Sequence, residues 1–513
     1  MAFVLVFAKV IIMKIKNYIF IAWALAAMNV QADTLQLDLA ATIAMAQRQS
    51  PSVQSARNTF LSAYWAYRYH QANYLPSLSL SSSPYINKEV NKITQSDGTA
   101  LFLKQDQLSA DLTLKINQNI SLTGGSLFVK SSLNRLDELH NKITAYSSQP
   151  FIVGYEQSLF GYNSLKWDRR IEPIRFRESK KRYAETLEIV SAKACEHFFG
   201  LASAQAEWEM AKQNFASADT LYQMAKGRYE NGTISENEML QLEINRLNEE
   251  TNVMDAQVDL REKMQTIRSF LGLEQSQDIS LVMPEEVPAF EVPLQRAIDW
   301  ALLNSPDPDY YRRIQKESES RLAQARANTG LKAELYMQFG LSQTGADIGA
   351  AYRSPMSQQS ARITIALPIL DWGRGKGRVR EAKSQLALTQ TQVEQGMRDF
   401  YQNVEKLVLQ FNMQARKVHV ASLTDQRAEK RHVVARRLYI MGRNSILDLN
   451  VAISEKDAAR RNYISTMQTY WSLYYTLRSM TGFDFEHNKE LKEELPIKPQ
   501  IRNYAPNMIQ KRK

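Results

Sequence analysis

The sequence predicts a mainly α-helical chain with long two-faced β-strands, arranged as a helix–strand–helix unit that occurs twice. Three observations support this fold class. Short sequence matches recur at two fixed spacings, apolar and polar residues alternate over long stretches, and a heptad pattern continues through two very long segments. The composition agrees, because 19 Gly and 15 Pro among 513 residues leave little of the chain for linkers or disorder.

The first 32 residues have the three parts of a secretion signal. Lys14 and Lys16 precede a short apolar run, and small residues end the segment. The alternative interpretation is a transmembrane anchor, but such a span needs roughly 20 apolar residues. We therefore expect residues 1–32 to be a signal peptide and the mature chain to begin at Asp33, with Met13 as a second candidate start.

Short matches that recur in the same order predict an internal duplication. Ser50–Val53 corresponds to Ser305–Pro308 at an offset of 255 residues. Arg228–Ser235 corresponds to Leu438–Ser445 at an offset of 210, and RSFLG corresponds to RSMTG at that same offset. Chance readily produces one such match but not several in order, so we interpret the mature chain as two copies of one unit.

The two offsets also predict the boundaries of the repeats. We expect repeat 1 at 33–290 and repeat 2 at 291–485. The offsets differ by 45 residues, which we assign to an extra hairpin in repeat 1 at about 81–150. The charged segment 486–513 contains three prolines and is expected to be a flexible C-terminal tail.

The elements of repeat 1 follow from changes in its apolar period. Helices are expected at Leu39–Arg48 and at about 51–74, where a proline in the first turn suits a helix start. Apolar and polar residues then alternate through Leu108–Leu122, which is typical of a two-faced strand. A TGG turn at Thr123–Gly125 and a returning strand at Phe151–Phe160 complete this part.

Repeat 2 has two shorter alternating runs, at Leu335–Leu341 and Ile363–Ile369. Alternation alone fits either a membrane barrel or one wall of an ordinary β-sandwich. The strand of repeat 1 is longer than a bilayer core, since 15 residues at 3.3 Å each span roughly 50 Å. We expect its end to project outside the cell as a hairpin, with additional barrel strands as the alternative.

A very long helix follows the strands of each repeat, at about 164–229 and about 378–439. Apolar residues recur along both at alternating steps of three and four, which is the pattern of a coiled-coil seam. At 1.5 Å per residue, such a helix is about 100 Å long, which is too long for a compact domain. The helix before the strands and the helix after the turn together have nearly this length, so two short helices can stack beside each long one.

The charged and reactive residues exclude several other classes. The formal net charge of +10 is spread along the long helices, which does not favour nucleic-acid binding. The single cysteine, Cys195, excludes a disulfide framework, and the six histidines have no ligand spacing. The run Gly373–Gly377 lacks the Lys-Ser/Thr of a phosphate-binding loop. We therefore expect no metal, no cofactor and no enzymatic activity.

Four segments carry a resemblance to a known family. They are RYENGTISENEML at Arg228–Leu240, LYIMGRNSILDL at Leu438–Leu449, LPILDWGRGKGRV at Leu367–Val379 and AIDWALLNSP at Ala297–Pro306. In these segments the chain resembles the TolC family of outer-membrane efflux and secretion channels, and the resemblance extends over about 35–485. It implies a mainly α fold with membrane β-strands, in which the duplicated repeats of three chains form a trimeric β-barrel and a long periplasmic α-helical barrel.

The resemblance also implies a function and a location. It indicates a trimeric exit duct of a tripartite efflux or type I secretion system, located in the outer membrane of a Gram-negative cell and extending into the periplasm. Such a duct is passive, contacts outer-membrane lipid, and opens at its helical tip when a periplasmic adaptor and an inner-membrane RND or ABC transporter dock. The main alternative is a periplasmic adaptor, which carries one helical hairpin rather than two. A secreted coiled-coil protein is a third possibility, against which the duplicated helix–strand–helix order argues.

By resemblance, the functional residues lie at the turns that follow the long helices. Gly232 and Gly442 suit helix ends that need a left-handed residue. Six residues beyond them, Glu238 and Asp448 would each form a ring of three carboxylates around the closed aperture. The alternative is that each acid only complements the dipole of its own helix.

Further candidates lie beside these turns and where the strands of repeat 2 end. The additional aperture candidates are Tyr229, Tyr439, Arg443 and Asn444. For the two tyrosines, packing in the helical seam is the alternative. A strand-to-helix transition at the membrane surface is expected at Pro368, Trp372 and Gly373. Trp372 there suits an interfacial aromatic belt, with core packing as the alternative.

Overall fold

The computed structural model describes residues 35–139, 141–274 and 278–491. The predicted signal peptide, 1–32, and most of the predicted tail, 492–513, lie outside the described residues. The described chain divides into two compact units. The described parts of unit 1 are 35–56, 186–274, 278–297 and 406–491, and those of unit 2 are 57–139, 141–185 and 298–405. Each unit therefore combines segments from both predicted repeats.

The long helices have the same length in the two repeats. Helices α4 (Ser164–Glu230) and α9 (Arg374–Ile440) each contain 67 residues, and each passes from unit 2 into unit 1. The helices that follow the turns, α5 (Glu236–Leu271) and α10 (Ile446–Thr481), each contain 36 residues. In the described part of the chain, no helix combines the length and the apolar character needed to span a membrane.

The heptad pattern of the sequence corresponds to a buried seam on α4. Its residues Val190, Ala194, Phe198, Leu201 and Ala204 are all at most 2% exposed. Alanines between larger residues allow neighbouring helices to approach closely. The long helices of unit 1 are therefore held by this apolar seam, although other apolar side chains of these helices, such as Leu409, Met413 and Val420, are exposed.

Shorter helices precede the strands of each repeat. They are α2 (Leu39–Gln49), α3 (Pro51–Ala72), α6 (Leu294–Asn304) and α7 (Asp307–Thr329). Prolines lie at the starts of α3 and α7. Amide groups in the first turn of a helix have no acceptor within the helix, so the missing amide hydrogen of proline costs no hydrogen bond there. In unit 1, the Gln49 side chain donates a hydrogen bond to the Leu271 carbonyl at 3.3 Å, so the ends of α2 and α5 meet.

Two small pairs of strands complete unit 1. Strand β1 (Leu35–Asp38) pairs in parallel with β7 (Ile279–Val282). Strands β10 (Phe483–Asp484) and β11 (Lys489–Glu490) form an antiparallel pair, and β11 lies in the segment predicted as a flexible tail. Arg478 of α10 lies 2.9 Å from Glu188 of α4 and 3.2 Å from Asp484 of β10, which joins these elements through buried charges.

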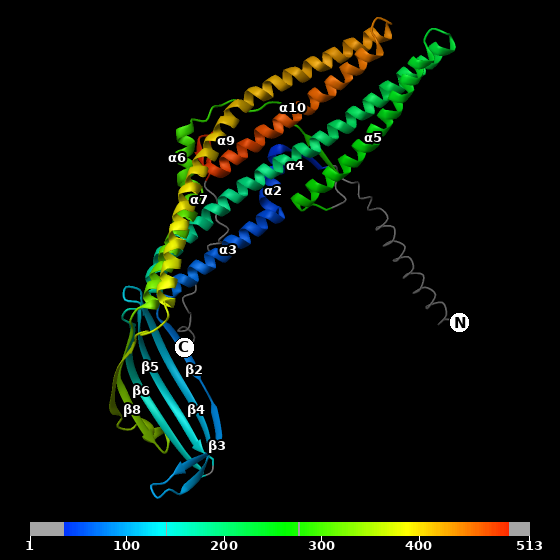
Figure 1. The fold of residues 1–513 in the computed structure, drawn as a ribbon. Helices are drawn as coiled ribbons and strands as arrows, with labels where there is room; N and C mark the ends of the chain where they lie inside the picture. The colour runs from blue at the N-terminus through cyan, green and yellow to red at the C-terminus, as the bar shows by residue number, and fades with distance from the viewer. Residues whose placement is uncertain (1–34, 140, 275–277, 492–513) are drawn as a thin grey trace, which may run out of the picture. The chain divides into compact units, whose positions relative to one another are not determined.

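Unit 2 contains one large antiparallel sheet (Figure 1). Its order is β2 (Ser77–Ser82), β4 (Ala100–Ile120), β5 (Gly125–Glu138), β6 (Ile143–Ser158), β8 (Lys332–Gly345) and β9 (Met356–Ala366), and β3 (Tyr85–Thr94) pairs with the first part of β4. A short helix, α8 (Ile348–Tyr352), connects β8 to β9.

The strands of repeat 1 differ from the sequence-based expectation. The sequence predicts one returning strand after the TGG turn, whereas the structure has two, β5 and β6. Strand β5 escapes the pattern because both of its faces mix apolar and polar residues: Ser131 shares the face of Val129, and Leu136 shares the face of Lys130 and Phe128. The ring of Phe128 lies over Gly154 of β6, where an added Cβ would be only 2.1 Å from it. The β3–β4 end forms a hairpin, and the β4–β5 pair lies within the sheet.

Candidate functional site

The turns that join the long helices to α5 and α10 have the same backbone geometry. The backbone is left-handed at Gly232 and Gly442, with φ of +68° and +70°. After each glycine the next amide, of Thr233 or Arg443, donates to the carbonyl five residues earlier at 2.9 Å. This is the Schellman motif, in which a Cβ at the left-handed position would cause strain. Each glycine thus adopts the left-handed conformation at the end of its long helix.

A serine caps the helix that follows each turn. The hydroxyls of Ser235 and Ser445 accept hydrogen bonds from the amides of Glu238 and Asp448, both at 3.2 Å. The carboxylate of Asp448 also accepts a hydrogen bond from the Ser445 hydroxyl at 2.6 Å, and a longer one from the Ser445 amide at 3.4 Å. Asp448 therefore completes a capping box and remains exposed to solvent.

The second acid, Glu238, has different surroundings. It is half-buried and lines a small pocket with Arg228 and Tyr439. Burial raises the pKa of the Tyr439 hydroxyl, and the negative charge of Glu238 raises it further. Glu238 thus lies at the seam between the two hairpins, whereas Asp448 faces solvent.

A small apolar cluster holds the two hairpins together near their turns. Its buried members come from α4, α5, α9 and α10 and are Leu221, Ala225, Leu242, Ala435, Tyr439, Leu449 and Ala452. The Arg228 guanidinium donates to the Ile440 carbonyl across the same seam at 3.4 Å. Tyr439 is 8% exposed and packs in this seam, while Tyr229 is 39% exposed. Arg443 is exposed on its turn, and Asn444 is half-buried.

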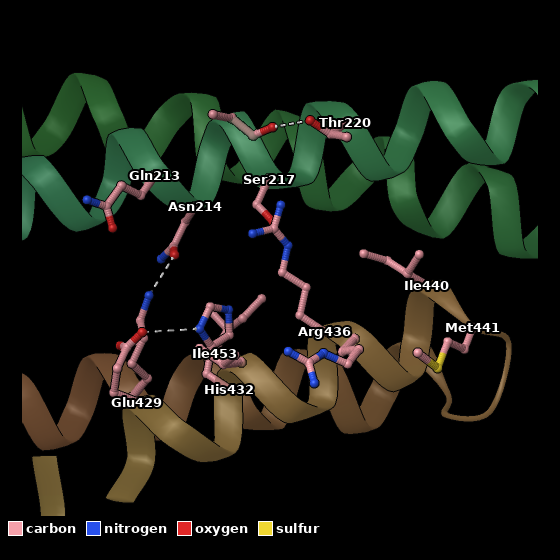
Figure 2. A pocket seen from close by; sticks show the side chains of 14 residues that line it. Gln213, Asn214, Ser217, Thr220, Glu429, His432, Arg436, Ile440, Met441 and Ile453 are labelled. Carbon is pink, nitrogen blue, oxygen red and sulfur yellow. Dashed lines mark hydrogen bonds and ion pairs between the residues drawn. The ribbon is translucent and has the colours of Figure 1, made fainter. Parts of the chain in front are cut away.

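A polar groove of about 730 Å³ lies beside this cluster, between α4 and the α9–α10 hairpin. The ammonium group of Lys456 donates to the Asn214 side chain at 3.2 Å and lies 3.3 Å from the Asp457 carboxylate. Asn214 in turn donates to Asp457 at 2.7 Å. Figure 2 shows Asn214 on one side of the groove and, on the other side, Glu429 beside His432.

The groove is polar where it is most buried, because its two buried side chains are a lysine and an asparagine, while Val433, Ile440 and Ile453 add apolar side chains to its lining. Lys456 is 7% exposed and Asn214 is 8% exposed. Burial lowers the pKa of His432, and the nearby positive charge of Lys456 lowers it further. This network is not visible in the sequence, because its partners are separated by more than 200 residues and form no motif.

The large sheet of unit 2 has one apolar face and one polar face. Residues paired across neighbouring strands share a face, so the strand register continues each face across the sheet. The row Ile116, Val129, Val153 and Phe339 is apolar from β4 to β8. Exposed large side chains on this face include Leu78, Leu80, Leu112, Leu114, Ile116, Leu127, Phe339, Ile363 and Ile365. A face with this many exposed apolar side chains is suited to lipid.

The predicted strand-to-helix transition lies between the end of β9 and the start of α9. Trp372 has φ of +54° and is 89% exposed, so it is not packed in the core of its own chain. The Asp371 carboxylate accepts hydrogen bonds from the amides of Gly375 at 2.7 Å and Gly373 at 3.0 Å. These bonds lower the pKa of Asp371 and start α9. Pro368 follows β9 among exposed apolar residues, including Ile369.

Comparison with known proteins agrees with this architecture. The sequence profile described as "Outer membrane efflux protein" matches residues 119–273 and 297–482. No protein with a curated description matches the chain.

Three solved structures are similar in fold. The outer membrane protein VceC from Vibrio cholerae is 15% identical, with 86% of this chain and 96% of that chain covered and a TM-score of 0.61. The Campylobacter jejuni CmeC outer membrane channel is 14% identical, with coverages of 89% and 87% and a TM-score of 0.63. The open state of the Neisseria gonorrhoeae MtrE outer membrane channel is 14% identical, with coverages of 90% and 91% and a TM-score of 0.55.

The profile covers about two thirds of the chain and includes both helical hairpins. The predicted fold class is confirmed as a mainly α chain with long helical hairpins and a β-domain, in the repeated architecture of outer-membrane efflux proteins. The predicted function and location are confirmed as an efflux exit duct in the outer membrane with a periplasmic extension, and the adaptor alternative is not favoured. The chain belongs to the outer membrane efflux protein family.

Proposed function

We propose that three copies of this chain form a passive homotrimeric duct whose helical tip opens when the two hairpins of each chain separate. The observation that carries this proposal is the two-faced sheet of unit 2. Its apolar face is suited to lipid, yet strands β2 and β9 form its edges. Unpaired strand edges are not tolerated in a bilayer, so the sheet must be closed by other copies.

The tip proposal rests on the limited seam between the hairpins. The seam consists of the apolar cluster around Tyr439 and the hydrogen bond from Arg228 to the Ile440 carbonyl. The polar groove at Lys456 lies next to it, so apolar contact does not continue without interruption along the hairpins. Docking of a periplasmic adaptor together with an inner-membrane RND or ABC transporter would part this seam and widen the aperture.

We assign Asp448 as the main acid of the closed aperture and Glu238 as a secondary one. The capping role of Asp448 is compatible with a pore role, because a capping carboxylate is charged and this one is exposed. Three copies would place three such carboxylates around the axis and attract cations. Arg443 and Asn444 lie on the same turn, where the positive charge of Arg443 would weaken that attraction. Tyr229 and Tyr439 would hold the tip closed by packing.

The remaining assignments concern energy and anchoring. The transporter supplies the energy, so this chain needs no catalytic step, cofactor or metal, and its proposed partners do not include nucleic acid. The exposed segment around Pro368, Trp372 and Gly373 would contact outer-membrane lipid at the barrel rim.

The experiment is extraction of the protein from outer membranes followed by recording in planar bilayers. We expect a detergent-dependent trimer with ion conductance. The double substitution Glu238→Gln with Asp448→Asn should lower its cation preference, and Glu230→Gln, outside the two proposed rings, is the matched control. A soluble monomer without conductance would contradict the duct, and an unchanged cation preference would contradict the acidic rings alone.

A further inference from the structure

The β4–β5 hairpin is an integral part of the large sheet. Strand β4 pairs with β2 on one side, from Ser77 opposite Asn117 to Ser82 opposite Leu112. Strand β5 pairs with β6 on the other side over most of its length. The apolar row that contains Ile116 crosses the hairpin without changing face. The hairpin therefore shares the lipid-facing surface of the strands on both sides of it.

The directions of the strands permit this sheet to close with copies of itself. Among the described residues, the main path of the sheet has six strands, and each neighbouring pair is antiparallel. Because six is even, the two edge strands β2 and β9 run in opposite directions. The β9 edge of one copy can therefore pair with the β2 edge of the next in the same antiparallel pattern.

The polar face of the hairpin carries a pair of like charges. Lys115 of β4 and Lys130 of β5 are directly opposite each other, and both are half-buried. Their cross-strand row continues through Ser79, Ile152, Gly340 and Gln358, none of which is acidic. Like charges in directly opposed positions destabilise a sheet, so packing alone gives no reason for this pair.

The surroundings leave the positive charge of the pair uncompensated. Within the described ranges, no carboxylate lies at ion-pair distance from Lys115 or Lys130. The ammonium of Lys115 lies 4.7 Å from the centre of the Phe128 ring, which orients the charge without neutralising it. Elsewhere on this face the charges are mixed, since Glu156 and Arg362 share one row around Tyr336.

We propose that the β4–β5 hairpin forms part of the barrel wall, so that three copies close an 18-stranded barrel with a girdle of Lys115 and Lys130 that favours anions in its lumen. This proposal rests on the homotrimer proposed above. An antiparallel barrel of about 16–18 strands leaves an aqueous channel, and its polar face lines that channel. Two lysines from each copy at one level would then raise the local concentration of anionic solutes.

The first test places single cysteines in a Cys195→Ala background and records current while a charged, membrane-impermeant thiol reagent is added. Modification of Lys115→Cys or Lys130→Cys should reduce the current, because both face the lumen. The matched controls Leu114→Cys and Val129→Cys are on the lipid face and should leave it unchanged. If the trimer conducts and its current is unchanged after modification at both lysine positions, the wall proposal is overturned. Failure of the unmodified protein to form a conducting trimer would instead reject the homotrimer.

The second test measures ion selectivity after the tip acids have been neutralised by Glu238→Gln and Asp448→Asn. In that background, Lys115→Gln with Lys130→Gln should lower the anion-to-cation permeability ratio by a factor on the order of two. Lys92→Gln makes the same kind of charge change on β3, outside the six-stranded path, and should leave the ratio unchanged. An equal ratio in the lysine double variant and its parent would overturn the girdle.

Discussion

The two repeats of this chain have matching helices but different strands. Helices α4 and α9 have equal lengths, and so do α5 and α10. In the described part of the sheet, repeat 1 contributes four strands to the main path, β2, β4, β5 and β6, whereas repeat 2 contributes β8 and β9. The additional strands of repeat 1 therefore lie in the sheet, while the long helices have the same lengths in both repeats.

This difference has a physical reason. Residues added to a helix in a coiled-coil seam rotate every later residue away from the seam unless the insertion preserves the heptad. A hairpin added to an antiparallel sheet keeps the alternation of direction and face on both sides. The helical part of the fold is thus constrained in length, while the barrel can gain strands in pairs.

The largest effect is expected in the helical seams, where the repeats should behave alike. Phe411 of α9 and Leu201 of α4 are equivalent at the offset of 210 residues, and both are at most 1% exposed. Phe411→Ala should destabilise the fold by about 3–5 kcal/mol and Leu201→Ala by about 2–5 kcal/mol. Thermal unfolding of the purified protein measures both. The exposed Leu409→Ala is the control, and a seam variant as stable as this control would contradict the comparison.

The next largest effect on stability should differ between the two repeats. Arg478 and Arg268 are equivalent in sequence, and each side chain is 16% exposed, but Arg478 pairs with the buried Glu188 and Asp484, whereas Asp278, an ion-pair partner of Arg268, is 70% exposed. Arg478→Met leaves two buried carboxylates without their cation and should cost about 3–5 kcal/mol. Arg268→Met should cost about 1 kcal/mol or less. Equal losses in unfolding experiments would show that burial does not distinguish these two ion pairs.

Some features of the fold and of the candidate site can be predicted from the sequence, and others cannot. The seam around Phe198 and the turns at Gly232 and Gly442 follow from local periodicity and backbone requirements, which are visible in a single sequence. Strand β5 cannot be predicted in this way, because apolar and polar residues occur on both of its faces, including Phe128 on the polar one. The network of Asn214 and Lys456 was missed because only the packing of two distant helices brings these residues together.

A smaller effect should depend on pH in unit 2, at a position where the repeats differ. Asp309 of α7 contacts Arg177 at 3.0 Å and Lys181 at 2.8 Å, and the equivalent residue of repeat 1 is Gln54. Burial alone would raise the pKa of Asp309, but the hydrogen bonds from the two cations outweigh it and hold the pKa below its usual value.

A carboxyl group with a lowered pKa stabilises the fold above its unfolded pKa, near 4, and this contribution is lost as the pH falls through the folded pKa. Asp309→Asn should therefore destabilise the protein by about 1–3 kcal/mol at neutral pH, and this loss should shrink progressively as the pH falls below about 4. Unfolding measured from pH 2 to 7 checks this. A loss that is constant over that range would contradict the role of the charge.

The smallest effect should again be the same in both repeats. Gly232→Ala and Gly442→Ala place a Cβ on a left-handed residue, which should cost about 1–2 kcal/mol each, confined to the turns. Nothing in the described residues lies within 4 Å of either added Cβ, so backbone strain is the only expected cause. Faster hydrogen exchange of the turn amides is the measurement, and Gly200→Ala within α4 is the control. Unequal effects at the two turns would show that their surroundings differ.

The most direct test of the account is a cysteine cross-linking scan between the edge strands of neighbouring copies. Ser79→Cys on β2 is combined with single cysteines from Ser360 to Thr364 on β9, in a Cys195→Ala background. Since paired residues share a face, we predict disulfide-linked trimers with at least one of the polar-face positions Ser360, Arg362 and Thr364. Ala361 and Ile363 lie on the apolar face and should not cross-link. Cross-links at those two positions, or none between copies at any position, would contradict closure of the barrel through β2 and β9.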